Sequence, residues 1–471
     1  MSAPLRTHAA WRVLDGFGGS KRAWSRSVAP RTTDEMAAVF AAARAEGMQV
    51  SFRGAGRSYG DASLNSGQLS IDGRAMRRIL SFDAKTGVIE AEGGVSIAEI
   101  WRHTLPQGWW PAVVPGTMFP TMGGCVGMNI HGKNCFKAGP FGDHVLELDL
   151  LTASGDKKTL SRTQEPELFR AVIGGLGLLG AVTRVKLHLK HVYSGRLKVR
   201  PLVSRNLAHM FDQFAERTST SDYLVGWVDC FGSGDALGRG LVHQSHHFAE
   251  GEDPKGHETL ALSKQELPGA IMGFPKSLLW LPMSLFANDQ GARFVNAVKY
   301  ALPEPVSNDG TYLDSHAGFS FLLDYVPDWR LMYGRDGFIQ VQLFVPDATA
   351  RDAFAEALRV CQKRNVISYL GVFKRHKPDD FLLSHGLDGW SLALDFKVPR
   401  DAQRLWDCAR DLTRIVLEAG GTYYPAKDQV VDAESFAKAF GPRYDQFRDM
   451  RRQMDPSALF ANDQARRLGL A

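Results

Sequence analysis

The sequence predicts an α+β protein built from two domains, and three observations lead to this prediction. The chain has 471 residues and 44% hydrophobic content, which is enough for more than one core. Residues 30–190 alternate short β-like runs with glycines, whereas residues 190–420 contain longer strands and helices. A short strand and a helical segment follow. We therefore predict domains over 1–188 and 189–421, with 422–471 returning to the first domain.

The first predicted domain has short strands bounded by glycines or turn residues. Two helices interrupt these strands. One covers 33–46 with Thr33 as its N-cap, and the other covers 96–104, where Ser96 and Glu99 form a capping box. We expect the strands at 49–52, 69–71, 87–92, 145–151 and 181–189.

The second predicted domain and the end of the chain contain longer elements. We expect strands at 338–345, 390–396 and 422–424, and helices at 348–364, 402–418 and 433–454. Residues 274–286 are strongly apolar and could face a lipid chain or a membrane surface. Their two prolines argue against a long amphipathic helix, so we predict that this segment belongs to the domain core.

Charge and composition exclude several classes of partner. The net charge is +5, and the Lys and Arg residues are scattered along the chain, so we expect no nucleic-acid partner. Residues 1–19 contain Arg6, Arg12 and Asp15 and no apolar run. We therefore expect no secretory leader and no transmembrane segment, and a cytoplasmic location is the default expectation.

The cysteines and histidines do not predict a metal site. The five cysteines are widely spaced, odd in number and form no C-x-x-C pair, so we expect free thiols in a reducing compartment. His243, His246 and His247 lie close together but lack acidic or cysteine partners at ligand spacing. We predict that this cluster is a polar loop.

Residues 53–61 form the most informative glycine cluster. Three glycines and two arginines follow a short apolar run, and such a loop can direct backbone N–H groups at a phosphate. The third glycine, Gly60, comes one residue too late for a Rossmann fingerprint, and a second strand rather than a helix follows. The loop therefore predicts a nucleotide site of another kind, and the alternative is a hairpin connection that binds nothing.

A second glycine cluster, 174–180, contains a literal G-x-G-x-x-G. A helix over 166–173 precedes it and a strand follows it, which reverses the Rossmann order and excludes a nicotinamide site. The cluster would let the backbone approach a flat ligand closely. A helix C-cap followed by a turn explains about half of its glycines equally well.

A third cluster, 115–134, alternates small residues with side-chain donors. A buried isoalloxazine needs a wall of this kind, with small residues against its face and polar groups at its edge. His131 and Lys133 lie in this run, and both are candidates for a role at such a site.

In their order along the chain, 53–61, 115–134 and 174–180, the three clusters resemble the vanillyl-alcohol oxidase and p-cresol methylhydroxylase family of FAD enzymes. Further motifs are similar to the branch of that family that oxidises the 2′-hydroxyl of decaprenylphosphoryl-ribose, and the resemblance covers nearly the whole chain. These motifs are 130–134, 149–153, 372–374, 426–428 and 460–468.

The resemblance implies a PCMH-type FAD-binding fold with an antiparallel-sheet substrate domain. Several family members attach FAD through a histidine, but Arg57 occupies that position here and cannot form the 8α-histidyl bond, so we predict non-covalent FAD. The cofactor-binding residues that the resemblance implies are Arg53, Gly54, Ala55, Gly56, Arg57, Ser58, Tyr59, Gly60, Asp61, Ala62, Gly116, Thr117, Thr121, Met122, Gly123, Gly124, Met128, Asn129, Ile130, His131, Gly132, Val182 and Tyr424.

The implied chemistry is oxidation of a secondary alcohol, in which a base takes the hydroxyl proton while the carbinol hydride passes to flavin N5. Lys427 is the leading catalytic candidate, with His131 and Tyr59 beside it, and a structural ion pair with Asp428 is the alternative for Lys427. Cys135 and Phe136 replace histidines of the branch, and Ala393 replaces a pocket cysteine of some of its members. The implied substrate residues are Lys133, Gln340, Gln342, Lys374, Ala393 and Lys427.

The implied partners follow from the same resemblance. We expect a small-molecule or lipid-linked sugar, most specifically the 2′-hydroxyl of a polyprenyl-phosphate ribofuranose, together with a partner reductase and peripheral contact with a membrane. Two alternatives remain, namely a soluble sugar, polyol or nucleoside oxidase of the same fold and a non-catalytic flavoprotein. The sequence leaves the electron acceptor and the oligomeric state open.

Overall fold

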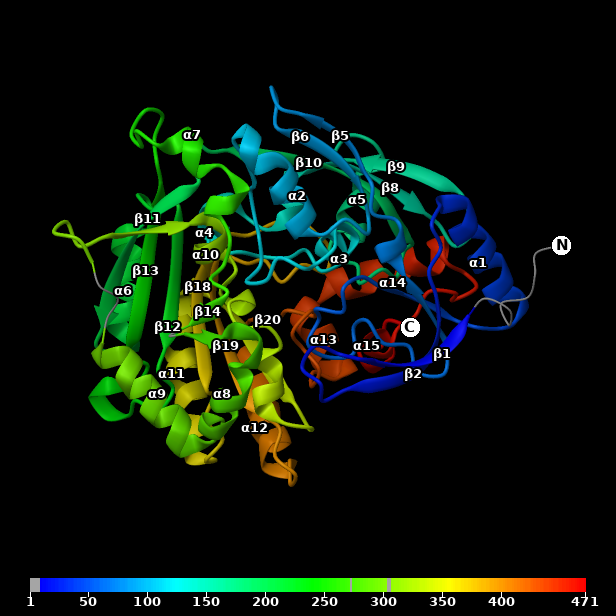
Figure 1. Cartoon of the computed structure of the whole chain (residues 1–471). Helices are drawn as coiled ribbons and strands as arrows, with labels where there is room; N and C mark the ends of the chain where they lie inside the picture. The colour runs from blue at the N-terminus through cyan, green and yellow to red at the C-terminus, as the bar shows by residue number, and fades with distance from the viewer. Residues whose placement is uncertain (1–8, 272, 303–305) are drawn as a thin grey trace.

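The computed structural model describes residues 9–271, 273–302 and 306–471. Its strands form sheets of four, six and eight strands and one two-stranded pair. Figure 1 shows the first two sheets on one side of the molecule and the eight-stranded sheet on the other. The pairs in the six- and eight-stranded sheets are antiparallel. The predicted α+β class, with an antiparallel sheet in the second half of the chain, is confirmed.

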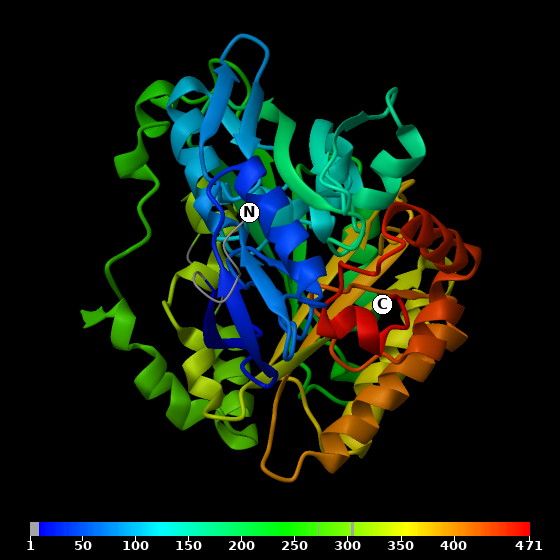
Figure 2. The same cartoon turned by 90° about the vertical axis from the view of Figure 1, so that its right-hand side faces the viewer.

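The four-stranded sheet has the order β1-β2-β4-β3 and combines one antiparallel pair with two parallel pairs. The helix α1 (Thr33–Ala45) packs Phe40 against Phe460, which comes from the end of the chain. Figure 2 shows this C-terminal segment in red close to the blue N-terminal strands, and the N–H of Val50 donates to the carbonyl of Leu459 at 2.7 Å. The strands are β1 (Ala10–Asp15), β2 (Arg22–Val28), β3 (Val50–Arg53) and β4 (Leu69–Asp72).

The six-stranded sheet has the order β5-β6-β10-β8-β9, with β7 also paired to β10. Side chains along β10 alternate between buried and partly exposed, as expected of a strand with one face on the core. The strands are β5 (Ile79–Asp83), β6 (Val88–Glu92), β7 (Trp109–Pro111), β8 (Val145–Leu151), β9 (Lys157–Ser161) and β10 (Ala181–His191). Its helices are α2 (Ile97–Thr104), α3 (Met122–Gly127), α4 (Cys135–Ala138) and α5 (Pro166–Val172).

The eight-stranded sheet has the order β16-β11-β13-β12-β18-β19-β17-β20. Three helices, α6 (Leu207–Arg217), α11 (Asp347–Lys363) and α12 (Gln403–Glu418), pack on the sheet, and Phe211 and Phe214 of α6 make edge-to-face contacts with Phe373 and Trp390. The strands are β11 (Arg196–Ser204), β12 (Tyr223–Val228), β13 (Gly240–His247), β16 (Tyr312–Ser315), β17 (Phe338–Pro346), β18 (Leu370–His376), β19 (Gly389–Lys397) and β20 (Thr422–Tyr423).

Short elements connect and close these sheets. The two-stranded pair consists of β14 (Ala270–Ile271) and β15 (Phe274–Pro275), and the helix α8 (Trp280–Phe286) packs on the short helix η9 (Trp329–Tyr333). The remaining helices are α7 (Gly256–Thr259), α9 (Asp289–Ala301), α10 (His316–Ser320), α13 (Ala433–Phe440), α14 (Pro442–Met454) and α15 (Asp463–Arg467).

The structure corrects four local predictions. Thr32, not Thr33, caps α1, whereas the capping box of Ser96 and Glu99 is confirmed. The single helix expected over 433–454 is two helices, because Gly441 adopts φ 53° and Pro442 starts the second one. The three clustered histidines lie on the strand β13 rather than in a loop.

The fourth correction concerns the apolar segment 274–286, which we predicted to be core. No residue of α8 is buried, and Leu285 is 74% exposed. Met283 is the partly buried side chain that packs inward, against the aromatic cluster around Tyr59 and Trp329. Leu279, Trp280 and Pro282 are also partly buried, whereas Phe274, Leu278, Leu281, Leu285 and Phe286 are exposed, so the segment lies at the surface rather than in the core.

Two other expectations concern the ends and the thiols. The expectation of no secretory leader falls partly on residues 1–8, which lie outside the described residues. Within the described residues, no helix has the length and apolar character needed to cross a membrane. The five cysteines are buried free thiols. The predicted domain boundaries stay predictions.

Candidate active site

A cavity of about 490 Å³, here called the chamber, lies between the loop of residues 53–59 and the eight-stranded sheet. The loop and the run 114–133 form one side of the chamber. The strands β17, β18 and β19 form the other side, with Gln340, Gln342 and Lys374 facing inward. Residues 424–427 close the chamber directly after β20. The chamber thus brings together the loop 53–59, the run 114–133 and the predicted substrate residues of the second half of the chain.

A narrower cavity of about 110 Å³, here called the channel, shares Gly54, Thr121, Gly124 and Met128 with the chamber. Backbone forms most of its walls, and both the loop and the second glycine cluster contribute glycines. A Cβ on Gly54 would lie 2.3 Å from Oγ1 of Thr121, so only glycine fits that position. The channel suits the extended, phosphate-bearing half of FAD and the chamber suits its flat ring system, so the residues present fit the cofactor.

Hydrogen bonds hold the loop 53–61 in shape from both sides. The guanidinium of Arg53 donates to the carbonyl of Asp15 at 2.9 Å and to Oγ of Ser63 at 2.9 Å. The N–H of Tyr59 donates to the carbonyl of Ala426 at 2.8 Å. The backbone of the loop therefore lies directly against the segment that carries Lys427.

Arg467 clamps the same two segments together. Its guanidinium forms salt bridges of 2.7 Å with Asp61 and 2.7 Å with Asp428, and all three side chains are largely buried. Because an arginine fork can bind two carboxylates at once, this one side chain fixes the loop relative to the segment that carries Lys427. Asp428 is thus paired with Arg467, and the alternative of a Lys427–Asp428 ion pair receives no support.

The structure brings most of the predicted cofactor residues to these two cavities. Gly60, Asp61, Ala62, Met122 and Asn129 line neither of them. Asn129 instead bonds Ser384 and Gly142, and Met122 is core. The residues that line the chamber, the channel or both are Arg53, Gly54, Ala55, Gly56, Arg57, Ser58, Tyr59, Gly116, Thr117, Thr121, Gly123, Gly124, Met128, Ile130, His131, Gly132, Val182 and Tyr424.

The predicted substrate residues Lys133, Gln340, Gln342, Lys374, Ala393 and Lys427 all line the chamber. The ammonium of Lys427 lies 3.4 Å from the centre of the Tyr59 ring. Burial lowers the pKa of Lys427 to about 7, although the carboxylate of Asp395 opposes this shift. Burial also lowers the pKa of Lys133 to about 7 and that of Lys374 to about 8. The chamber therefore contains amines that can exist in the neutral form near neutral pH.

His131 sits at the centre of a buried polar and aromatic cluster. Its Nε2 lies 3.1 Å from Nε2 of Gln342, and its Nδ1 makes no hydrogen bond with a described residue. The rings of Tyr424 and His376 lie 4.9 and 5.2 Å from its own. Burial lowers the pKa of His131 well below its usual value, so the ring is neutral.

Sequence reasoning missed several residues of the chamber. Asp395 is fully buried, its Oδ1 accepts a hydrogen bond from Gln340, and its Oδ2 accepts none from the residues that the structure describes. Asp395 follows Ala393 by two positions on β19, so the alternation of a strand could have placed it in the pocket. Trp227, His243 and Lys299 also line the chamber, and no sequence signal pointed to them.

The channel and the chamber fit FAD, and comparison with known proteins assigns the chain to the FAD-dependent oxidoreductases that act on CH–OH groups. Residues 24–161 match the family described as FAD binding domain. Over 449 residues, the chain is 33% identical to decaprenylphosphoryl-β-D-ribose oxidase of Mycolicibacterium smegmatis, covering 92% of each chain. The chain belongs to the family of that oxidase.

Two further relatives are more distant. The chain is 28% identical over 378 residues to the "Uncharacterized protein in mprA 5'region" of Streptomyces coelicolor, covering 80% of this chain and 100% of that protein. It is 35% identical over 213 residues to cytokinin dehydrogenase 6 of Oryza sativa subsp. japonica, covering 42% of this chain and 40% of that protein. The expected PCMH-type FAD-binding fold is confirmed.

Proposed function

We propose that this enzyme oxidises the 2′-hydroxyl of a polyprenyl-phosphate ribofuranose to a ketone. The observation that carries the proposal is the position of Lys427 in the chamber, between the loop 53–59 and the inward-facing side chains of β17 and β18. The name of the relative that matches 92% of the chain supports the substrate. A soluble sugar, polyol or nucleoside is the competing substrate class.

When bound, FAD supplies the two-electron acceptor for the hydride that leaves the carbinol carbon. The neutral amine of Lys427 accepts the hydroxyl proton at Nζ, so the alcohol loses one hydride and one proton and becomes a ketone. The Tyr59 ring stabilises the ammonium that results, since a cation 3.4 Å from the ring centre is attracted by its face. Asp395 stabilises the same charge from the other side of the chamber.

We propose that the remaining polar residues bind the sugar and orient it. Gln340 and Gln342 lie two positions apart on β17 and so face the same side of the sheet. Lys133 donates to the carbonyl of Phe319 and lies 4.2 Å from the centre of its ring, which fixes the amine at the chamber wall. Ala393 leaves room for substrate where a larger side chain would fill the chamber.

We propose further that the FAD is bound non-covalently. By resemblance, Arg57 stands where related enzymes carry the linking histidine, and a guanidinium cannot form the 8α-histidyl bond. In the same way, we propose the division of the chain into an FAD-binding part, 1–188 with 422–471, and a substrate-binding part, 189–421. The clamp of Arg467 on Asp61 supports this division, because it ties the last segment to the first.

We propose that the surface around α8 and α9 rests on a lipid bilayer. Nine large apolar side chains between residues 274 and 302 are at least 39% exposed, and Phe294, Leu302 and Leu285 exceed 60%. Arg293, exposed on α9, adds positive charge, which suits anionic headgroups. A membrane position would present the enzyme to a lipid-linked substrate, and a partner reductase would consume the ketone.

Anaerobic reduction of the flavin tests this function. The FAD-loaded enzyme is mixed with farnesyl-phosphoryl-β-D-ribofuranose, with free ribose, and with a panel of polyols and nucleosides, and loss of the flavin absorbance is followed. We expect rapid bleaching only by the lipid-linked ribose. Bleaching by free sugars at comparable concentrations would favour the competing class, and a protein that binds FAD but is bleached by none of them would be a non-catalytic flavoprotein.

A further inference from the structure

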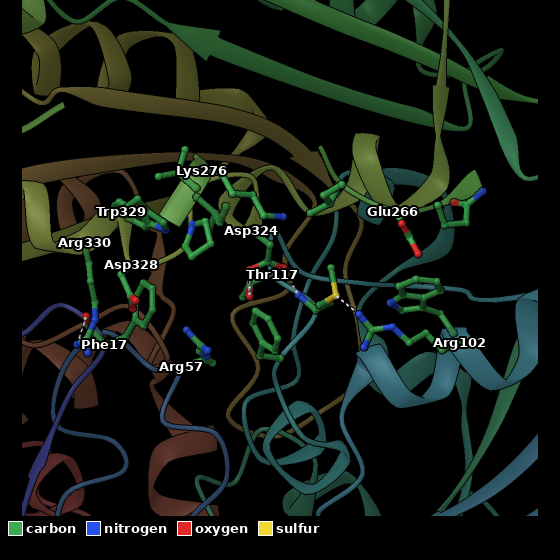
Figure 3. A pocket seen from close by; sticks show the side chains of 18 of the residues that line it. Phe17, Arg57, Arg102, Thr117, Glu266, Lys276, Asp324, Asp328, Trp329 and Arg330 are labelled. Atoms are coloured by element: carbon green, nitrogen blue, oxygen red, sulfur yellow. Dashed lines mark hydrogen bonds between the residues drawn. The ribbon is translucent and has the colours of Figure 1, made fainter. Parts of the chain in front are cut away.

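A second cavity of about 630 Å³, here called the outer cavity, adjoins the chamber and is shown in Figure 3. The two cavities share Phe17, Arg57, Thr117 and Leu323, so they meet at these side chains. Apart from these four shared side chains, no residue of the outer cavity was assigned above to the flavin ring system or to the sugar. The function proposed above therefore leaves the outer cavity without an assigned role.

The guanidinium of Arg57 stands at the junction. It lies 5.3 Å from the centre of the Phe17 ring and 4.7 Å from the centre of the Phe119 ring. Its Nε is buried without a hydrogen-bond partner among the described residues, and it forms no salt bridge with any of them. Two rings thus hold a desolvated cation by its faces, which leaves its N–H edges available to an anion.

Two further cations line the outer cavity from other parts of the chain, as Figure 3 shows. Arg102 belongs to α2, where its guanidinium lies 5.0 Å from the centre of the Trp101 ring. Lys276 follows β15 directly. Neither forms a salt bridge with a residue of the described ranges, whereas Arg330, the fourth cation, is paired with Asp15 at 3.0 Å.

Three carboxylates face the same cavity, and the charge of Asp324 acts on both Arg57 and Lys276. Asp324 accepts hydrogen bonds of 2.7 Å from Oγ1 of Thr117 and 2.7 Å from the N–H of Met118, so its oxygens are used to fix the wall. The side chains of Trp101, Leu267 and Val326 add apolar surface. The charged groups that face the cavity are Arg57, Arg102, Lys276, Arg330, Glu266, Asp324 and Asp328.

We propose that the outer cavity binds the phosphodiester and the first isoprenoid units of a lipid-linked substrate while its sugar occupies the chamber. This inference rests on the function proposed above. Arg57 contacts the phosphate at the junction, and Arg102 and Lys276 attract it from the far walls. Guanidinium groups suit this task better than the chamber amines, because they keep their charge at every physiological pH. The chain would leave beside Lys276, where the exposed apolar segment 274–286 begins.

The first test compares two substrates that differ by one phosphate methyl group and therefore in charge, farnesyl-phosphoryl-β-D-ribofuranose and its methyl phosphotriester. With the FAD-loaded wild-type enzyme, we expect the anionic substrate to reduce the flavin with an apparent Kd at least about tenfold lower than that of the neutral triester. Arg102→Glu and Lys276→Glu should each remove most of this preference, with an unchanged FAD content and an unchanged limiting rate of reduction. Lys276→Arg should retain the preference.

Lys264→Glu is the matched control, because Lys264 is exposed and adjoins two lining residues, Leu262 and Gln265, without lining the cavity itself. Equal loss of the preference in Lys264→Glu would reduce the effect to general surface charge and overturn the proposal. An unchanged preference in both Arg102→Glu and Lys276→Glu would also overturn it. A loss of the preference for the anionic substrate in Lys299→Gln, without a loss in the two outer-cavity variants, would overturn it too, since Lys299 lines the chamber.

A second measurement does not require the oxidation. Calorimetry on the FAD-loaded enzyme compares farnesyl phosphate, farnesol and inorganic phosphate. We expect farnesyl phosphate to bind most tightly and to weaken in Arg102→Glu and Lys276→Glu. If that result is obtained but no ribose substrate bleaches the flavin, lipid-phosphate binding in the outer cavity is supported and the proposed function is refuted. Equal binding of inorganic phosphate and farnesyl phosphate would overturn the lipid part of the proposal, and bleaching without any effect of the variants would overturn the cavity alone.

Discussion

The ammonium nitrogen of Lys427 lies over the face of the Tyr59 ring, 3.4 Å from its centre. Tyr59 is buried in an aromatic cluster with Phe17 and Phe338, and its N–H donates to the carbonyl of Ala426, the residue before Lys427. The ring and the lysine backbone are thus fixed by separate contacts. The amine is held at one point of the chamber while its protonation state can change.

Replacing Lys427 by Met should remove the base and keep an unbranched apolar side chain of similar length. We expect the rate of anaerobic flavin reduction to fall by about 10²–10⁴-fold, which is the usual contribution of a general base. FAD content and the thermal unfolding midpoint should change little. Lys438→Met, at an exposed position of α13, is the control. A Lys427→Met enzyme that is reduced at the wild-type rate would remove Lys427 from the mechanism.

The rate of reduction should rise with pH through about 7, where the Lys427 pKa lies, because the neutral amine is the base. Asp395 raises that pKa by its charge, so Asp395→Asn should move the midpoint of the profile to lower pH. A stopped-flow pH profile of both enzymes measures the shift. A midpoint that moves to higher pH in Asp395→Asn would contradict the assigned relationship.

Gly54→Ala should impair FAD binding, because its Cβ would lie 2.3 Å from Oγ1 of Thr121 where channel and chamber meet. We expect the variant to purify with a lower flavin content and a Kd for added FAD at least about tenfold higher, as a blocked close approach implies. Gly269→Ala provides the comparison, since a Cβ there meets no atom within 4 Å. Equal flavin content in both variants would show that the loop tolerates a side chain.

Denaturation should release the whole flavin from the wild-type protein, because Arg57 cannot form the histidyl link. After acid precipitation, we expect the supernatant to contain one free flavin for each chain precipitated. The washed pellet should show no flavin fluorescence. Fluorescence retained by the denatured chain would demonstrate a covalent attachment through another residue.

Leu281→Glu should weaken binding to vesicles that contain anionic lipids, because it places a charge on the apolar surface of α8. The loss should be at least about tenfold in partition coefficient, from the burial lost by one leucine. Leu146→Glu on β8 is matched in exposure, 43% against 46% for Leu281, and lies on the other side of the molecule in Figure 1. Equal effects of the two substitutions in cosedimentation would contradict a specific membrane face.

The regular elements of this chain could largely be predicted because their signals are local. The side chains of Ser96 and Glu99 bond each other's backbone within one turn, and β8 covers the predicted residues 145–151. The break at Gly441 escaped prediction because the apolar periodicity continues across it. The segment 274–286 was misplaced because composition alone cannot distinguish core from an exposed apolar surface.

The candidate site divides in the same way. Glycine-rich loops can be recognised in the sequence alone, and the residues of 54–59 and 128–133 that line the chamber were among those predicted. Asp395 and Lys299 came from elements that carry no motif, and only the packing of β19 and α9 brings them to the chamber. The clamp of Arg467 joins residues 406 positions apart, a pairing that no local pattern can reveal.

That clamp also sets an order of events during synthesis. The family match ends at residue 161, but the loop within it is held in place by Ala426 and Arg467, which are made much later. A nascent chain that has not reached them lacks these contacts to the loop 53–61. We therefore expect flavin uptake to follow translation of the whole interval, and the N-terminal segment on its own should remain colourless however well its own sheets form.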